Sequence, residues 1–139
     1  MTFLDSNIFL YYCDPTDSAK QSIARKIVLE AVQDGGSVIS AQVLNEFACV
    51  AMRKLKKTYE EVLTFIDVFK LIPVCDVKSK WTVRALGIQR QFGLQFYDSL
   101  LLAAAEANGC TEFLSEDLND GQIYCGMKAV NPFKIKEVA

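Results

Sequence analysis

Histidine is missing from all 139 residues of the sequence. Its absence excludes imidazole as a general acid or base, and with it the Ser-His-Asp and Cys-His arrangements of nucleophilic catalysis. It also excludes zinc and iron sites that depend on histidine ligands. Any chemistry that this chain performs must therefore come from carboxylates, lysine side chains or hydroxyl groups.

Long hydrophobic runs are absent too. A bilayer-spanning helix needs about 18 consecutive uncharged apolar residues, and the sequence has no such stretch. The first residues, Met1 to Asp5, lack the basic region and apolar core of a secretory signal. The five cysteines are odd in number, widely spaced and free of any C-x-x-C pair, which argues against a disulfide framework and a zinc site. We therefore expect a cytoplasmic protein that has no membrane partner.

The order of apolar segments predicts one α/β domain over residues 1–139. Strands separated by helices imply right-handed crossovers and a parallel sheet of four to five strands with helices on both faces, a three-layer sandwich. Pro73 cannot donate a ladder hydrogen bond, so its strand is expected at a sheet edge. Thr58 and Glu61 are typical of a capping box that opens a helix. The predicted strands are 1–5, 37–40, 71–77, 111–115 and 127–130. The first predicted helix begins within 14–18 and ends near 33, and the other four cover about 41–57, 58–70, 79–91 and 97–107.

Four acidic residues stand where this architecture would bring them together. Asp5 and Asp117 follow predicted strands, Asp98 lies in the first turn of a very apolar helix, and Glu46 lies at the margin of the apolar stripe of another helix. In open parallel sheets, ligands bind beyond the carboxyl ends of the strands. Clustered carboxylates repel one another unless cations are bound, and oxygen ligands without histidine or thiolate select Mg²⁺ or Mn²⁺.

Each of these residues also has an ordinary structural explanation. Asp5 and Asn7 can serve the turn after the first strand, and Glu46 can be a boundary residue of its helix. Asp98 is favoured in a first turn by the helix dipole. The run Ser115 to Gly121 satisfies an Asx-rich turn by composition alone. The combination of all four acids, more than any one of them, favours a binding site.

Four short blocks of the sequence resemble the signature blocks of PIN-domain nucleases in order, spacing and strand context. They are Asp5-Ser6-Asn7, Asn45-Glu46-Phe47, Tyr97-Asp98-Ser99, and Ser115-Glu116-Asp117 followed by Asp120. Length and block style are most similar to the VapC-like toxins of bacterial toxin–antitoxin pairs. The resemblance implies a sheet in the order 3-2-1-4-5, which puts the strand with Pro73 at an edge.

The resemblance further implies a ribonuclease that hydrolyses phosphodiester bonds by a two-metal carboxylate mechanism, with Mg²⁺ or Mn²⁺ as cofactor. Expected partners are the RNA substrate and a VapB-like antitoxin protein, and whether the chain also forms a homodimer stays open. Two departures from the family are a serine, Ser99, where alanine is common, and a serine, Ser115, where threonine often occurs. The implied ligands are Asp5, Glu46, Asp98 and Asp117, with Asp120 as an auxiliary acid and Asn7 and Ser115 as polar supports.

A basic run near the end of the helix that carries Glu46 is the candidate RNA-binding surface. Its members are Arg53, Lys54, Lys56 and Lys57. Such a local patch could offset a formal net charge of −2. The same cations could instead complement the helix C-terminus and keep it soluble.

Two other functions remain open at this stage. One is a catalytically silent PIN-like module that binds RNA or protein, although no acid of the set is missing. The other is an aspartyl-phosphate phosphohydrolase, which expects a second acid two residues after the first. Asn7 occupies that position here.

Overall fold

The computed structural model describes residues 1–134, which form six strands and six helices around one apolar core. No helix among these residues is long and apolar enough to cross a membrane. In chain order the elements are β1 (Thr2–Leu4), α1 (Ser6–Tyr12), α2 (Ser18–Asp34), β2 (Ser37–Ser40), α3 (Ala41–Arg53), α4 (Tyr59–Phe69), β3 (Val74–Cys75), α5 (Ser79–Phe92), α6 (Phe96–Ala107), β4 (Glu112–Leu114), β5 (Ile123–Tyr124) and β6 (Met127–Val130).

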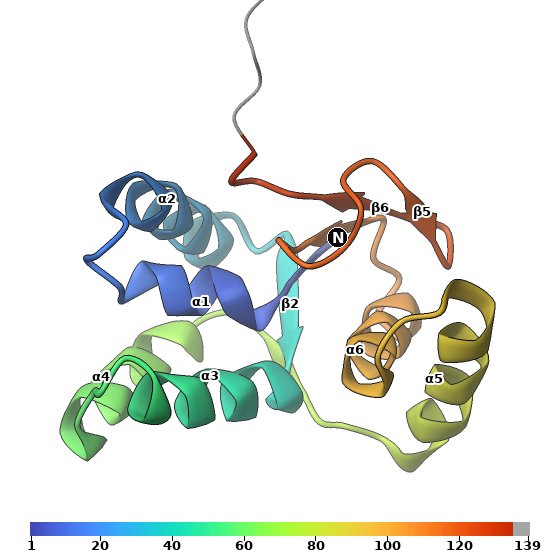
Figure 1. The fold of residues 1–139 in the computed structure, drawn as a ribbon, viewed down its shortest axis with the longest axis horizontal. Helices are drawn as coiled ribbons and strands as arrows, with labels where there is room; N and C mark the ends of the chain where they lie inside the picture. The colour runs from blue at the N-terminus through green and yellow to red at the C-terminus, as the bar shows by residue number, and fades with distance from the viewer. Residues whose placement is uncertain (135–139) are drawn as a thin grey trace, which may run out of the picture.

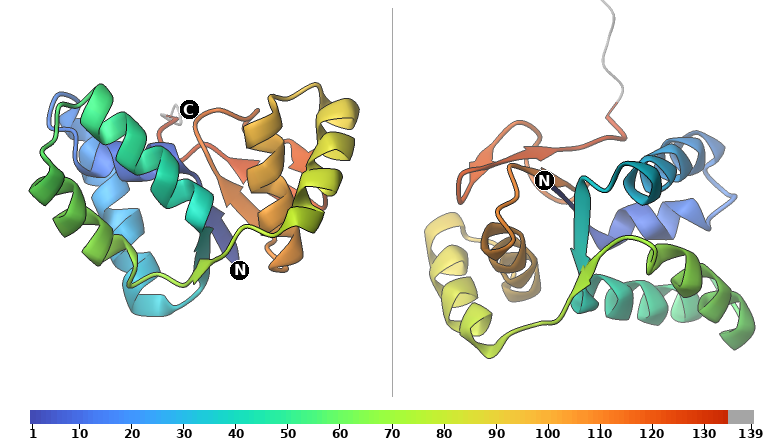
Figure 2. Two further views of the ribbon diagram at one scale, coloured as in Figure 1. Left: turned by 90° about the horizontal axis from the view of Figure 1, so that it is seen from below. Right: turned by 180° about the vertical axis from the view of Figure 1, so that it is seen from behind.

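The sheet has the order β3-β2-β1-β4-β6-β5, and every neighbouring pair is parallel except β5 with β6. Helices α1 to α4 lie on one side of the sheet, and α5 and α6 lie on the other (Figures 1 and 2). The α/β class, the parallel sheet and the order 3-2-1-4-5 are therefore confirmed, with β6 as the predicted fifth strand. One antiparallel strand, β5, is additional.

Strand β5 pairs with β6 through a two-residue turn. Cys125 and Gly126 both have positive φ, 51° and 78°, as a type I′ hairpin turn requires. The pairing joins Tyr124 to Met127. The sequence does not predict this hairpin, because a cysteine at the first turn position is not one of the residues, such as asparagine, that signal a left-handed backbone.

Helix α1 was also missed, and its cause is local. The Asp5 side chain accepts a hydrogen bond from the Ser6 backbone N–H at 2.6 Å, so Asp5 is the N-cap. A helix of seven residues is too short to show a clear helical period. The apolar run inside it buries Ile8 and Phe9 against the core.

Two predicted elements are shorter than expected. Helix α3 ends at Arg53 rather than near residue 57, and Lys56 then adopts a left-handed backbone with φ 56°. Strand β3 covers only Val74–Cys75 of the predicted 71–77. It lies at the edge of the sheet, as Pro73 predicted, and the Pro73 carbonyl accepts a hydrogen bond from the Ile39 N–H at 3.0 Å.

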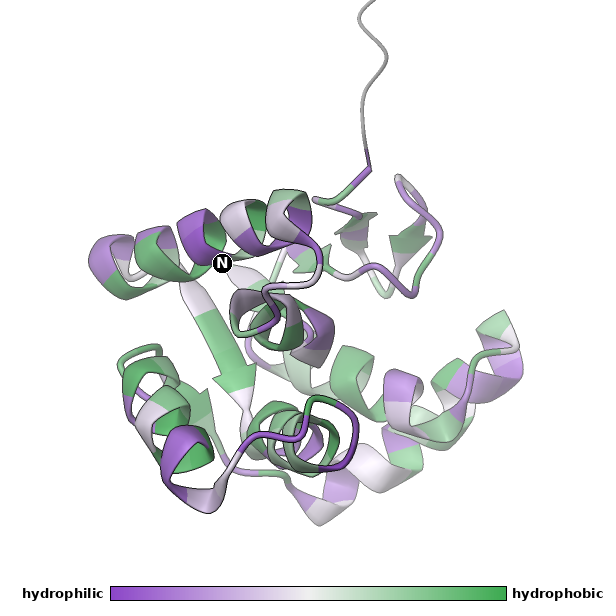
Figure 3. Ribbon diagram, turned by 60° about the vertical axis from the view of Figure 1, so that its left-hand side comes forward, coloured by the Kyte–Doolittle hydropathy of each residue, from purple (hydrophilic) through white to green (hydrophobic). Residues whose placement is uncertain are grey.

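The apolar core fixes the carboxyl ends of the central strands. Phe3 of β1 stacks on Phe113 of β4, with ring centroids 5.2 Å apart. Leu100 to Ala105 of α6 are all buried against the sheet. Figure 3 shows hydrophobic residues along the strands and hydrophilic residues mainly on the outer sides of the helices. Burial of these apolar surfaces is the main favourable contribution to folding.

Candidate active site

Three carboxylates meet at the carboxyl edge of the sheet. Asp5 follows β1, Asp117 lies in the loop after β4, and Asp98 lies in the first turn of α6. One oxygen from each lies within 4.8 Å of the others. Because β1 and β4 are parallel neighbours in register, the residues that follow them emerge side by side. This is the only group of three or more candidate metal ligands found in residues 1–134.

Asp5 is the buried member of the group, with 3% of its surface exposed. Its Oδ1 accepts from the Ser6 N–H, and its Oδ2 accepts from the Ser115 hydroxyl at 2.7 Å. Burial raises the pKa of Asp5 to about 6, and the charges of Asp117 and Asp98 act in the same direction. The two hydrogen bonds oppose this shift without cancelling it.

Glu46 of α3 faces the same group. Burial raises its pKa to about 7, and the charges of Asp5 and Asp98 add to the effect. Its Oε1 is buried and has no hydrogen-bond partner among the described residues. An unpaired buried oxygen costs free energy unless a ligand, ion or water satisfies it. Glu46 therefore has an acceptor atom available to such a group.

The four carboxylates fit a hard divalent cation. Burial and then the charge of Asp117 raise the pKa of Asp98 as well, so Asp5, Glu46 and Asp98 all resist carrying charge together. No lysine or arginine forms an ion pair with any of them within residues 1–134. Oxygen-only ligand sets of this kind suit Mg²⁺ or Mn²⁺.

Asn7 and Ser115 hold Asp117 beside Asp5. The Asn7 Nδ2 donates to Asp117 Oδ2 at 3.2 Å and lies 3.4 Å from the Ser115 hydroxyl oxygen. That hydroxyl in turn accepts from the Asp117 N–H at 3.0 Å. Asp5 and Asn7 do not lie on one extended strand, because α1 begins at Ser6. The two side chains are linked through Ser115 instead.

Asp120 is not brought into the group. Its Oδ1 accepts a hydrogen bond from the Asn131 N–H at 2.9 Å, and its Oδ2 lies 3.8 Å from the Lys134 amino group. The carboxylate therefore joins the loop after β4 to the segment after β6. Its auxiliary role stays a prediction, and its carboxylate does not belong to the group formed by Asp5, Asp98 and Asp117.

A buried glutamine that the sequence analysis did not single out connects two of the acidic elements. The Gln42 side chain of α3 donates to the Tyr97 carbonyl at 2.9 Å. Tyr97 precedes Asp98, and Gln42 stands one helical turn before Glu46, so this bond joins the helix turns that carry both acids. The signal was a polar residue on the apolar stripe, four positions before Glu46.

A second missed cluster supports the loop of Asp117 from its other side. Glu116 accepts from the Tyr11 hydroxyl at 2.8 Å and from the Lys20 amino group at 2.9 Å. Lys20 also lies over the Tyr11 ring, 4.7 Å from its centroid. These contacts hold Glu116 away from the carboxylates while its neighbour Asp117 turns toward them.

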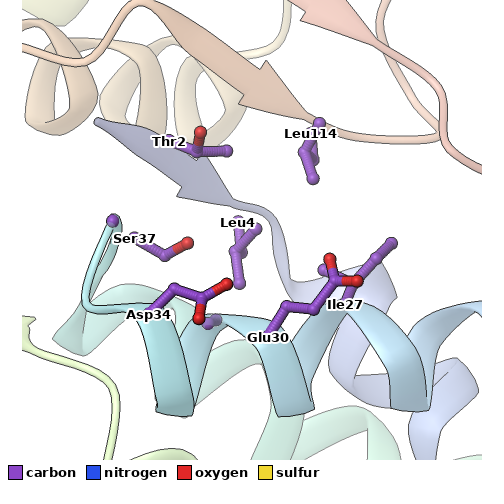
Figure 4. Close-up of a pocket in the computed structure, with 9 residues that line it drawn as sticks. Thr2, Leu4, Ile27, Glu30, Asp34, Ser37 and Leu114 are labelled. Atoms are coloured by element: carbon purple, nitrogen blue, oxygen red, sulfur yellow. The ribbon is translucent and has the colours of Figure 1, made fainter.

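Another pocket, of about 240 Å³, lies between α2 and the strands β1 and β2 (Figure 4). Glu30 and Asp34 rise from α2 toward β1 there. They stand four residues apart on the helix, but they do not belong to the carboxylate group described above. This pocket is therefore separate from the candidate site.

The four basic residues follow one another around the C-terminal end of α3. Arg53 is its last residue, and Lys54 is its C-cap. The Lys57 N–H donates to the Ala51 carbonyl at 3.0 Å and closes the turn. None of the four cations forms an ion pair within residues 1–134. Their charges are thus available to an external anion.

The structure is that of an α/β protein with a mostly parallel sheet and, at the carboxyl edge of that sheet, a group of carboxylates that fits a divalent cation. A sequence model of the PIN domain family matches residues 2–119, which include all four acids. The chain belongs to the PIN domain family. A comparison with curated protein sequences finds no match.

Solved structures with the same fold include three from toxin–antitoxin systems. The Mycobacterium tuberculosis toxin VapC20, described as cleaving the sarcin-ricin loop, is 15% identical, with a TM-score of 0.66 over 81% of this chain and 87% of that chain. A Klebsiella pneumoniae toxin–antitoxin complex gives 15% identity and a TM-score of 0.67 over 97% of this chain and 100% of that chain. The structure of Rickettsia felis VapBC2 bound to a promoter DNA fragment gives 18% identity and a TM-score of 0.65 over 92% of this chain and 96% of that chain.

Proposed function

We propose that this protein is a metal-dependent ribonuclease that acts in the cytoplasm as the toxin of a toxin–antitoxin pair. The observation that carries the proposal is the convergence of Asp5, Asp98 and Asp117 within 4.8 Å, beside Glu46 with its unpaired Oε1. Membership of the PIN domain family and the described activity of VapC20 support RNA as the substrate. The toxin–antitoxin complexes of the same fold support an antitoxin partner.

In the proposed mechanism Asp5, Asp98 and Asp117 would hold Mg²⁺ or Mn²⁺, and Glu46 would contribute to a second ion site. The ions supply Lewis acidity that activates a water molecule and offsets the charge that develops on the phosphodiester. Ser115 and the helix N-terminus keep the Asp5 carboxylate in one orientation. The unpaired Oε1 of Glu46 would be available to such an ion or to a water molecule that the ion holds. No histidine base is required, which agrees with the composition.

Addition of Mn²⁺ or Mg²⁺ is expected to raise the melting temperature of the apo protein. An ion that binds only the native state stabilises it by mass action, by about 2.7 kcal/mol at one hundred times its dissociation constant. Thermal unfolding with and without millimolar metal measures the effect, and RNA cleavage is followed in parallel with EDTA and after metal is restored. An unchanged melting temperature together with EDTA-insensitive cleavage would refute the metal site.

We also propose that the basic run at the end of α3 binds RNA phosphates. Lys56 supports this proposal, because it occupies a left-handed position that glycine adopts without steric cost. A non-glycine residue pays roughly 1–2 kcal/mol for that conformation. Strained residues of this kind are concentrated at functional sites.

Replacement of Lys54, Lys56 and Lys57 together by glutamine is expected to weaken RNA binding and flatten its salt dependence. For single strands, each lost phosphate contact makes the negative slope of log binding constant against log salt concentration shallower by about 0.7. Fluorescence anisotropy over a salt series measures this. Lys56→Gly is the sharper variant, since it should weaken binding while leaving the free energy of unfolding unchanged or higher. Equal salt slopes for wild type and triple variant would assign the cations to helix termination alone.

A further inference from the structure

A pocket of about 200 Å³ lies between α1 and α3, which pack side by side (Figure 1). Most of its walls are apolar, and a lysine and an aspartate stand at its rim. Its lining residues are Asn7, Leu10, Tyr11, Asp14, Val50, Lys54 and Leu55. Only Asn7 among them belongs to the carboxylate site.

Asn7 connects this pocket to the carboxylate site. Asn7 lines the pocket, and its Nδ2 donates to Asp117 at 3.2 Å. The Asn7 Oδ1 is buried and has no hydrogen-bond partner among residues 1–134. A group bound in the pocket therefore lies next to the candidate site of phosphodiester cleavage.

Lys54 connects the same pocket to the basic run. Lys54 and Leu55 also line the next pocket, of about 430 Å³, whose wall includes Lys57. Helix α3 rises about 1.5 Å per residue, so Lys54 lies roughly 12 Å along the helix from Glu46. The surface thus presents, in order, a site for metal ions, an apolar hollow and a pair of lysines.

We propose that the pocket between α1 and α3 binds the base and ribose of the RNA nucleotide next to the scissile phosphate. This inference rests on the proposed ribonuclease function and extends it to a nucleoside subsite. A single RNA strand alternates phosphate, nucleoside and phosphate, which matches the order of metal site, apolar hollow and Lys54. The walls formed by Leu10, Val50 and Leu55 offer apolar contact to a base face, and every base has such a face.

Val50→Trp tests the subsite because the larger side chain fills the pocket. Glu46 lies one helical turn earlier on α3, so the metal-induced rise in melting temperature reports whether the carboxylate site is disturbed. Leu86→Trp on the exposed face of α5 is the matched control, since Leu86 is 55% exposed and lines neither pocket. We expect Val50→Trp to raise the KM for a short RNA by about tenfold, as loss of one base contact does. The control should leave the KM unchanged, and the metal-induced rise in melting temperature should be the same for both variants.

A substrate change gives the second arm of the experiment. Single abasic residues are placed on either side of the scissile bond of the same RNA. Wild type should lose about tenfold in kcat/KM for one of the two abasic substrates, whereas Val50→Trp should lose little more, because its pocket is already filled. If Val50→Trp does not fold, Lys54→Gln replaces it, with the KM for the intact RNA expected to rise by about threefold and the abasic effect to persist.

Four results would overturn the subsite. Equal KM values for wild type and folded Val50→Trp would show that no nucleoside occupies the pocket, as would equal cleavage of abasic and intact RNA by wild type. A Val50→Trp variant that keeps its KM for RNA but no longer forms a complex with a protein partner would assign the pocket to that partner. If wild type cleaves no RNA with metal present, the proposed function itself has failed, and the subsite fails with it.

Discussion

Asparagine in place of Asp98 is expected to lower RNA cleavage by at least about 1000-fold and to leave a folded protein. Loss of one ligand charge weakens the metal site, whose contribution to transition-state stabilisation is several kcal/mol. The side chain keeps its volume, so packing in the first turn of α6 should not change. Single-turnover cleavage at saturating Mn²⁺ measures the rate, and circular dichroism confirms the fold.

The same variant should unfold at a higher temperature than wild type when no metal is present. Burial and the charge of Asp117 raise the pKa of Asp98. A carboxyl group whose pKa is raised in the native state contributes stability at low pH that is lost as the pH rises through that pKa. Asparagine carries no charge at any pH, so it avoids this loss at neutral pH. Because Asp98→Asn lacks one ligand charge, metal should raise its melting temperature by less than it raises that of wild type.

Asp120→Asn is the matched control, because it removes one carboxylate charge from the same side of the molecule. Its carboxylate contacts Asn131 and Lys134 instead of the group of three. We expect cleavage within about threefold of wild type, since the ion pair of Asp120 with Lys134 is exposed and contributes little energy. Undiminished turnover by Asp98→Asn, or equal losses in both variants, would contradict the assignment of the carboxylate site.

Several parts of the fold could be predicted because the responsible signals are local. Thr58 and Glu61 form the expected capping box, with hydrogen bonds of 3.1 and 3.0 Å. Gly35 ends α2 with φ 67°, the left-handed geometry that glycine favours. Pro73 correctly indicated an edge strand. The elements that were not predicted, α1 and β5, have seven and two residues, and neither is long enough for a hydrophobic period to appear.

The meeting of Asp5, Asp98 and Asp117 could be anticipated from strand ends and one helix start, since a parallel sheet brings such ends to one edge. The contacts that orient them could not. Gln42 bonds to a carbonyl 55 residues away, and Glu116 binds a lysine 96 residues away. Such pairings depend on how helices pack on the sheet, and no short sequence pattern encodes them.

The proposed toxin role also leads to an expectation about a partner protein. A carboxylate cluster without its metals is a natural receptor for a guanidinium or ammonium group, which can bind two oxygens at once. An antitoxin that delivers an arginine or lysine to Asp5, Glu46 and Asp98 would neutralise their repulsion and compete with metal and substrate. Burial and then the neighbouring carboxylates raise the pKa of Glu46 to about 7, and burial raises that of Asp5 to about 6, so a cation bound there would favour the charged form of both groups.

Expression of the wild-type chain alone in a bacterial host is therefore expected to arrest growth, whereas expression of Asp5→Asn should be tolerated. The amide keeps the shape of the site, so the variant should still capture the antitoxin and co-purify with it. Asp120→Asn should remain toxic. Co-expression of wild type with the small protein encoded beside it should restore growth and yield a complex with suppressed RNA cleavage. The toxin role would be contradicted if high expression of wild type left growth unimpaired and the protein purified from its own host without a partner. The cleavage assays with Asp98→Asn would still test the nuclease proposal independently.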